Sequence, residues 1–134
     1  MMTNEEKFEH WLDRAQYDLD TADALFVSGR WFYVVFMCQQ AIEKLVKGLY
    51  VLYVSDDVPR IHNIKTLIKR LEDTLPVRVP ADKYTLFDTL TGFYMNGRYP
   101  ETISSVGAQV QENAAAPILS QTKEAFLWLL TLKP

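Results

Sequence analysis

The feature that most constrains the fold is a pair of long stretches with helical periodicity, separated by a break of only a few residues. In the first, apolar residues recur at steps of three and four, which predicts a helix from about Asn4 to Val27. The second stretch predicts a helix from about Trp31 to Tyr53. Gly29 can end the first helix, because glycine readily takes the left-handed conformation of a helix stop. So short a break folds the second helix back antiparallel, and we expect a long helical hairpin as the spine of the fold.

The second of these helices is apolar on nearly every side. On a helical wheel one face carries Val34, Met37, Cys38, Ala41, Leu45, Gly48 and Leu52. The opposite side still presents Phe36, Val46 and Tyr50. A helix of this kind is either central to its own fold or shared with another molecule. We therefore expect one face in the core of the chain and the other against a second copy, in a homodimer.

Three further helices are indicated downstream. Asn63 can cap a helix whose apolar stripe runs over Ile64–Leu71, and a fourth helix is expected over Pro80–Asn96. A last helix is predicted from about Asn113 to Leu132. No sustained period covers 98–113, which could be an irregular arm, a short helix or a segment that orders only on contact. No strand is indicated, so the fold class is all-α, an up-and-down bundle of four to five helices.

Composition narrows the class of protein. A chain of 134 residues with 49% hydrophobic content fits one domain over residues 1–134, and a net charge of −3 argues against a nucleic-acid-coating protein. The lone Cys38 has no disulfide partner, which suits a reducing compartment. No signal sequence is visible, and the longest apolar run, Trp31–Cys38, is far short of the ~20 residues that a membrane span needs. A soluble, cytoplasmic protein without a membrane partner is expected.

Several stretches, taken in order, resemble the HEPN domain (higher eukaryotes and prokaryotes nucleotide-binding). They are "QQAIEKLVK" in the second helix, "HNIKTLIKRL" at the third and "GFYMNGRYPE" after the fourth, together with Ala15, Asp18 and Leu19 in the first. The resemblance implies an all-α bundle that often forms a homodimer. It also implies a frequent setting in bacteria and archaea, a small operon in which a minimal nucleotidyltransferase is encoded next door. Family members act as nucleotide-binding or substrate partners of that enzyme, or as ribonuclease toxins whose neighbour is the antitoxin.

The ribonuclease branch of the family carries an arginine followed, after four to six residues, by a histidine. Guanidinium binds the scissile phosphate, and imidazole exchanges protons near neutral pH. None of the six arginines in this chain has a histidine at that spacing, so no catalytic residue is predicted. A composite site of Arg98 and His62 stays open. The alternative is that His62 introduces the third helix by bonding to a carbonyl, while Arg98 pairs with Asp18.

One flank of the second helix could bind a ligand. Tyr33, Gln40, Lys44 and Lys47 follow one another at helical steps, and two ammonium groups with an amide and a phenol could hold a phosphate and a base. We expect Gln40 and Lys44 to lie closer to the buried face than Lys47.

The same residues also have structural alternatives. Glu43 and Lys47 have the spacing of an i,i+4 ion pair, and Lys44 could bridge to Asp18 on the antiparallel first helix.

The "GRYP" stretch offers a further candidate. Pro100 biases Tyr99 toward extended geometry, so Arg98 and Tyr99 leave the fourth helix at a fixed angle. Arg98 could reach an anion and Tyr99 could stack on a base, or Arg98 could only lock the arm that follows. His10 lies off the apolar stripe and is expected to be a solvated surface residue. No metal-ligand set and no phosphate-binding glycine loop is present in the sequence, so neither a metal nor a cofactor is predicted.

Three functional hypotheses result. The first is a non-catalytic HEPN-type module that binds a nucleotide or substrate as partner of a minimal nucleotidyltransferase. The second is a toxin-type ribonuclease, for which RNA would be the substrate. The third is a helical interaction scaffold without a small ligand. The candidate ligand-binding residues are Tyr33, Gln40, Lys44, Lys47, His62, Arg98 and Tyr99, and the structural polar partners are Asp18 and Glu43.

Overall fold

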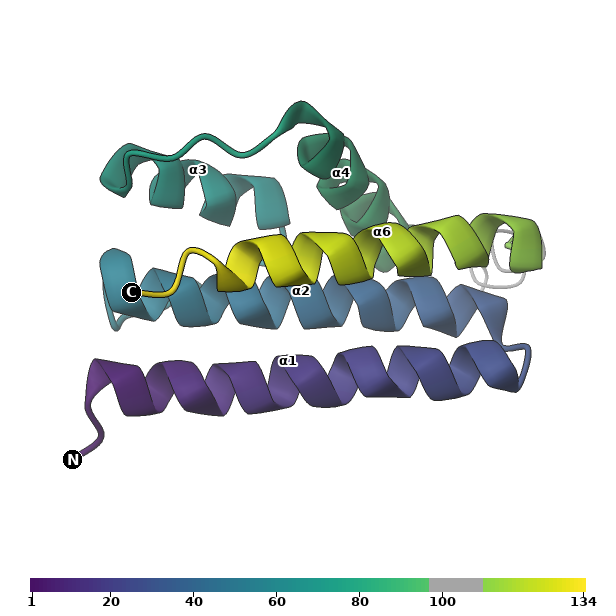
Figure 1. The fold of residues 1–134 in the computed structure, drawn as a ribbon, viewed down its shortest axis with the longest axis horizontal. Coiled ribbons are helices and arrows are strands. Elements are labelled where there is room, and N and C mark those ends of the chain that lie inside the picture. The colour runs from purple at the N-terminus through teal and green to yellow at the C-terminus, as the bar shows by residue number, and fades with distance from the viewer. Residues whose placement is uncertain (97–109) are drawn as a thin grey trace.

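The computed structural model describes residues 1–96 and 110–134, and over these residues it contains five helices and no strand (Figure 1). They are α1 (Asn4–Val27), α2 (Trp31–Tyr53), α3 (Ile64–Thr74), α4 (Ala81–Asn96) and α6 (Glu112–Leu130). The all-α prediction is confirmed, and the bounds of the first two helices agree with the sequence pattern. Over the described ranges, no helix is long and apolar enough to cross a bilayer.

Local signals in the sequence build the hairpin. Thr3 and Glu6 form a capping box at the start of α1, with both bonds at 3.1 Å. Gly29 has φ of 75°, a left-handed conformation that glycine adopts without steric cost. The chain then reverses, and α1 and α2 lie side by side over their whole length (Figure 1). The predicted spine of the fold is therefore present.

Helix α2 is the centre of the molecule. Each of α1, α3, α4 and α6 packs against it. The side that was predicted to meet a second copy is covered by the chain itself: Val46 and Tyr50 are buried, and Phe36 stacks on Tyr94 of α4 with ring centroids 5.3 Å apart. Val46 and Tyr50 are thus buried without a second copy, and Phe36 is half-buried. The homodimer itself stays a prediction.

Helices α1 and α2 approach each other closely at Gly48. A Cβ added at this residue would lie 3.0 Å from Cδ2 of Phe8 and 3.0 Å from Cβ of Trp11. Phe8 is 1% exposed, and the Cβ of Trp11 moves only with the α1 backbone. Neither neighbour has room to give way. Gly48 therefore sets the distance between the two long helices and fixes where Trp11 lies.

We expect Gly48→Ala to lower the free energy of unfolding by about 1–2 kcal/mol, because overpacking outweighs the helix propensity that alanine adds. Gly92→Ala is the matched control, since a Cβ there meets nothing within 4 Å and α4 is exposed at that position. The control should gain about 0.5–1 kcal/mol. Urea unfolding of both variants measures the difference, and equal effects would contradict the close packing at Gly48.

The two ends of the chain lie at the same end of the bundle (Figure 1). Tyr53 Oη at the end of α2 donates to the carbonyl of Leu132 at 2.5 Å. Lys133 Nζ pairs with Glu9 Oε1 of α1 at 2.7 Å. The last residues are thus fastened to both long helices.

Candidate functional site

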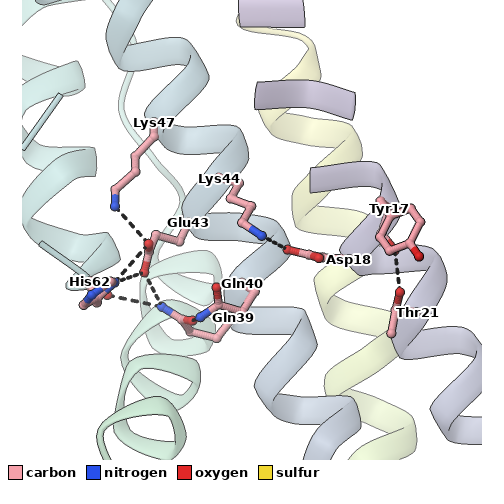
Figure 2. Close-up of polar contacts among 9 residues, drawn as sticks. All are labelled: Tyr17, Asp18, Thr21, Gln39, Gln40, Glu43, Lys44, Lys47 and His62. Atoms are coloured by element: carbon pink, nitrogen blue, oxygen red, sulfur yellow. Dashed lines mark hydrogen bonds and ion pairs between the residues drawn. The ribbon is translucent and has the colours of Figure 1, made fainter. Parts of the chain in front are cut away.

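A buried polar network lies between α2 and the residues that lead into α3 (Figure 2). Its α2 members are Gln39, Glu43 and Lys47, which are 0%, 4% and 7% exposed. Residues four apart fall on one face of a helix, so these side chains form a row. His62 completes the network from the position before the Asn63 cap. A polar row at this depth requires pairing, because an unpaired buried polar group costs free energy.

Glu43 is the acceptor at the centre of the network. Gln39 Nε2 donates to Glu43 Oε1 at 2.8 Å, and Lys47 Nζ donates to Oε2 at 3.0 Å. His62 Nδ1 lies 3.1 Å from each of the two carboxylate oxygens. A carboxylate only accepts hydrogen bonds, so Nδ1 carries the proton that faces Glu43. The buried acid therefore fixes both the tautomer and the orientation of the imidazole.

His62 is the accessible end of the network. Its side chain is 41% exposed, whereas that of Glu43 is 5% exposed. The ring lies 4.9 Å from the ring of Tyr94, measured between centroids. The backbone carbonyl of His62 accepts a 3.2 Å bond from Gln39 Nε2, which ties the loop to α2. Because Nδ1 faces Glu43, Nε2 is the nitrogen that can accept a bond from a ligand when the ring is neutral and donate one when it is protonated.

A separate ion pair lies on the α1 side of α2. Lys44 Nζ contacts Asp18 Oδ2 at 2.5 Å and joins the two long helices (Figure 2). The side chains are 27% and 9% exposed. The predicted bridge between Lys44 and Asp18 is confirmed. In the same view, Thr21 Oγ1 donates to the backbone carbonyl of Tyr17 at 2.8 Å, a bond within α1.

The predicted ligand-binding flank is divided in the structure. Lys44 points toward α1, while Lys47 points toward the His62 side of α2 (Figure 2). Gln40 Nε2 donates to the side-chain oxygen of Gln39 at 2.9 Å. Tyr33 is 48% exposed and packs edge-on against its neighbour Phe32. The four side chains therefore do not converge on one phosphate site, because each lysine is directed to a different carboxylate.

The expected order of burial along this flank is wrong. Glu43 and Lys47 are buried, whereas Gln40 and Lys44 are half-buried. The reason is that α3 and α4 cover the Glu43 side of α2, which a helical wheel of α2 alone does not include. The expected i,i+4 pair of Glu43 and Lys47 is present. Gln39 is a member that the sequence reasoning missed, although its spacing of four from Glu43 was a visible signal.

One prediction was that the His62 ring bonds to a carbonyl, and no such bond is present among residues 1–96 and 110–134. The ring faces Glu43, and it is the backbone of His62 that offers a carbonyl to Gln39. The predicted sites at Arg98 and Tyr99 lie outside the described residues, as does the stretch without a sustained period, 98–113, up to residue 109. Across residues 1–96 and 110–134, no three His, Cys, Asp or Glu side chains are grouped to hold a metal ion.

Comparison with known proteins places this arrangement in a family. The family model described as the HEPN domain matches residues 8–132. The chain belongs to the HEPN domain family. Two solved structures share the HEPN fold seen here. TT1696 from Thermus thermophilus is 23% identical, with a TM-score of 0.79 over 95% of this chain and 98% of that one.

The second structure is ST0689, described as an archaeal HEPN homologue. It is 25% identical, with a TM-score of 0.71 over 94% of this chain and 98% of that one. None of the curated proteins compared with the chain matches it. In this HEPN domain, then, the half-exposed group of the network is a histidine that a buried carboxylate holds in place.

Proposed function

We propose that this HEPN domain is a non-catalytic module that binds a nucleotide, or another phosphate-bearing substrate, for a minimal nucleotidyltransferase. The observation that carries the proposal is the half-exposed His62 imidazole held by the buried Glu43. An imidazole fixed in one orientation loses little conformational entropy when it binds a phosphate oxygen. Its protonated form donates a charge-assisted hydrogen bond through Nε2. The buried Tyr94 ring packs beside the imidazole and helps to hold it in place.

The polar partners of His62 support a binding role over a catalytic one. Gln39 has no group that titrates, and the Lys47 ammonium is buried and bonded to Glu43, so neither supplies a proton to a substrate. Phosphoester cleavage by acid–base chemistry needs one group to take a proton and another to give one. Within the described part of the chain, His62 is the one member of the network that is open to solvent to this extent.

We expect His62→Ala to weaken ATP binding about tenfold or more, because a hydrogen bond to a charged group contributes about 1.5–3 kcal/mol. Isothermal titration calorimetry of ATP into the wild-type chain and the variant measures this. Lys123→Ala is the control, since it removes a cation that pairs with Asp23 on α1, away from the network. Unchanged affinity in His62→Ala would overturn the site. Absence of heat from the wild type at millimolar ATP would favour the scaffold hypothesis.

The partner is tested separately from the ligand. We expect a minimal nucleotidyltransferase in the neighbouring reading frame. The chain is mixed with the product of that frame, and the complex is sought by size-exclusion chromatography with mass measurement by light scattering. A co-eluting complex supports the proposed partnership. The same measurement on the chain alone tests the predicted homodimer, which requires the mass of two copies.

A toxin-type ribonuclease is the second candidate, and the contact of His62 with Glu43 also favours it. A carboxylate that holds Nδ1–H leaves Nε2 free to take a proton from a ribose hydroxyl, the role of the oriented histidine in acid–base catalysis. In that case purified protein should cleave RNA, and His62→Ala should abolish the cleavage. RNA left intact by the wild type removes this candidate. Cleavage that survives the substitution removes His62 from the mechanism.

A further inference from the structure

A cavity lies at the end of the bundle where the chain begins, away from the His62 network. It has a volume of about 320 Å³ and is formed by α1, the end of α2 and the loop that follows α2. It shares no residue with the network between α2 and α3. Its lining residues are Met2, Lys7, His10, Trp11, Arg14, Val51, Asp56 and Val58. A volume near 300 Å³ is at the lower end of the range that small-molecule sites occupy.

Helix α1 supplies one wall of this cavity. Lys7, His10, Trp11 and Arg14 are separated by steps of three, one and three, which places them on one face of the helix. The position of Trp11 follows from Gly48, since the missing Cβ lets α1 approach α2 at this residue. The indole therefore stands at a fixed place in the cavity wall.

The floor of the cavity is apolar and its rim is cationic. Val51 is 3% exposed, and Val58 is half-buried beside it. Lys7 pairs with Asp56 at 3.3 Å, so the one acid in the lining is already matched by a base. Arg14 is then in excess, since it makes no ion pair with any described residue, and the exposed His10 ring beside it on α1 adds a polar N–H group.

Glu6 lies one turn before His10 on α1. The backbone and hydroxyl of Thr3 hold the pKa of Glu6 below its ordinary value, and the charge of His10 adds to this effect. Glu6 Oε1 accepts the backbone N–H of Thr3 in the capping box. This carboxylate is therefore committed to the helix start and does not neutralise Arg14. The cationic rim stands out in a chain whose net charge is −3.

We propose that this cavity binds a small organic anion that has a flat aromatic body. The anionic group is bound by Arg14 and His10, because guanidinium matches the geometry of carboxylate, sulfonate and phosphate oxygens. The aromatic body packs on Trp11 and on the valine floor. The site is independent of the proposed function, since it uses none of the residues that surround His62.

The test uses 8-anilinonaphthalene-1-sulfonate, an aromatic anion that becomes fluorescent in apolar surroundings. We expect saturable binding at one site on the wild-type chain. Arg14→Glu should weaken it at least tenfold, because the substitution replaces a charge-assisted bond by repulsion. Arg30→Glu is the matched control. Arg30 is an exposed arginine at the opposite end of the hairpin, and its replacement by glutamate changes the charge by the same amount. Circular dichroism confirms that both variants fold.

Two further variants separate this site from the other one. Trp11→Phe should keep binding of the dye, whereas Trp11→Ala should weaken it by about fivefold or more through the loss of the stacking surface. His62→Ala should leave dye binding unchanged even if it abolishes ATP binding. Equal dye binding by the wild type, Arg14→Glu and Arg30→Glu would overturn the proposal, as would the absence of saturable binding. Loss of dye binding in His62→Ala would also overturn it.

Discussion

Glu43→Ala is expected to lower the free energy of unfolding by about 3–5 kcal/mol. The substitution leaves the Lys47 ammonium, whose side chain is 9% exposed, without its carboxylate at 3.0 Å. It also removes the acceptor of Gln39 Nε2 and of the His62 ring. An uncompensated buried charge costs more than the pair contributes when it is intact. Urea unfolding followed by circular dichroism gives the difference from the wild type.

A double variant tests the reason for that loss. Glu43→Leu with Lys47→Met removes both charges and fills the space with apolar side chains, so it should restore most of the lost stability. Asp88→Ala is the control for an exposed pair, because Lys65 and Asp88 are 41% and 58% exposed at 3.5 Å. It should cost less than about 1 kcal/mol. If Glu43→Ala cost no more than Asp88→Ala, the network could not be as buried and as coupled as described.

Glu43 also links the stability of the domain to the proposed function. Glu43→Gln keeps the shape of the side chain and two of its hydrogen-bonding atoms, but it can no longer match both Lys47 and His62 as a double acceptor. A ligand that is bound by an oriented imidazole should therefore bind this variant more weakly than the wild type. The His62 side chain would still be present, so the loss would report on its orientation alone.

The parts of the fold that could be predicted are those fixed by neighbours in the sequence. The capping box of Thr3 and Glu6, the stop at Gly29 and the Asn63 cap each depend on residues within a few positions. The Asn63 side chain accepts from the backbone of Thr66 at 3.3 Å, as the sequence pattern indicates. Helix periodicity is likewise local, and for this reason the bounds of the hairpin agree with the prediction.

The parts that could not be predicted depend on residues that are distant in the sequence. His62 meets Glu43 across 19 positions, and no helical spacing indicates that contact. Lys47 was assigned to a ligand-binding flank because a wheel of α2 treats each side as if it faced water. In the folded chain α3 and α4 cover that side, so Lys47 is buried with the Glu43 partner that its spacing indicated, and Phe36 stacks on Tyr94. The packing of other helices over a side chain, more than helix propensity, decides which polar residues are free to bind.

Cys38 lies on a side of α2 that is closed to solvent, and its thiol is fully enclosed. The residue is 0% exposed. Burial raises the pKa of the thiol from its ordinary value near 9 to about 11, because the thiolate would lose its hydration in the core. Between these two values the unfolded chain releases the proton while the folded chain retains it. The folded state is therefore at no disadvantage below pH 9 and becomes progressively less stable above it.

From these two pKa values, Cys38 should reduce the free energy of unfolding by about 1 kcal/mol at pH 10 and about 2 kcal/mol at pH 11, relative to pH 8. Burial also raises the pKa of Tyr84, so that residue adds to the loss above pH 10. Cys38→Ala isolates the contribution of the thiol. Loss of the sulfur changes the free energy of unfolding of the variant by the same amount at every pH. Its stability should nevertheless fall less steeply between pH 8 and pH 10 than that of the wild type. Urea unfolding at the two pH values measures both slopes, and parallel slopes would mean that the Cys38 thiol ionises as readily in the folded chain as in the unfolded one.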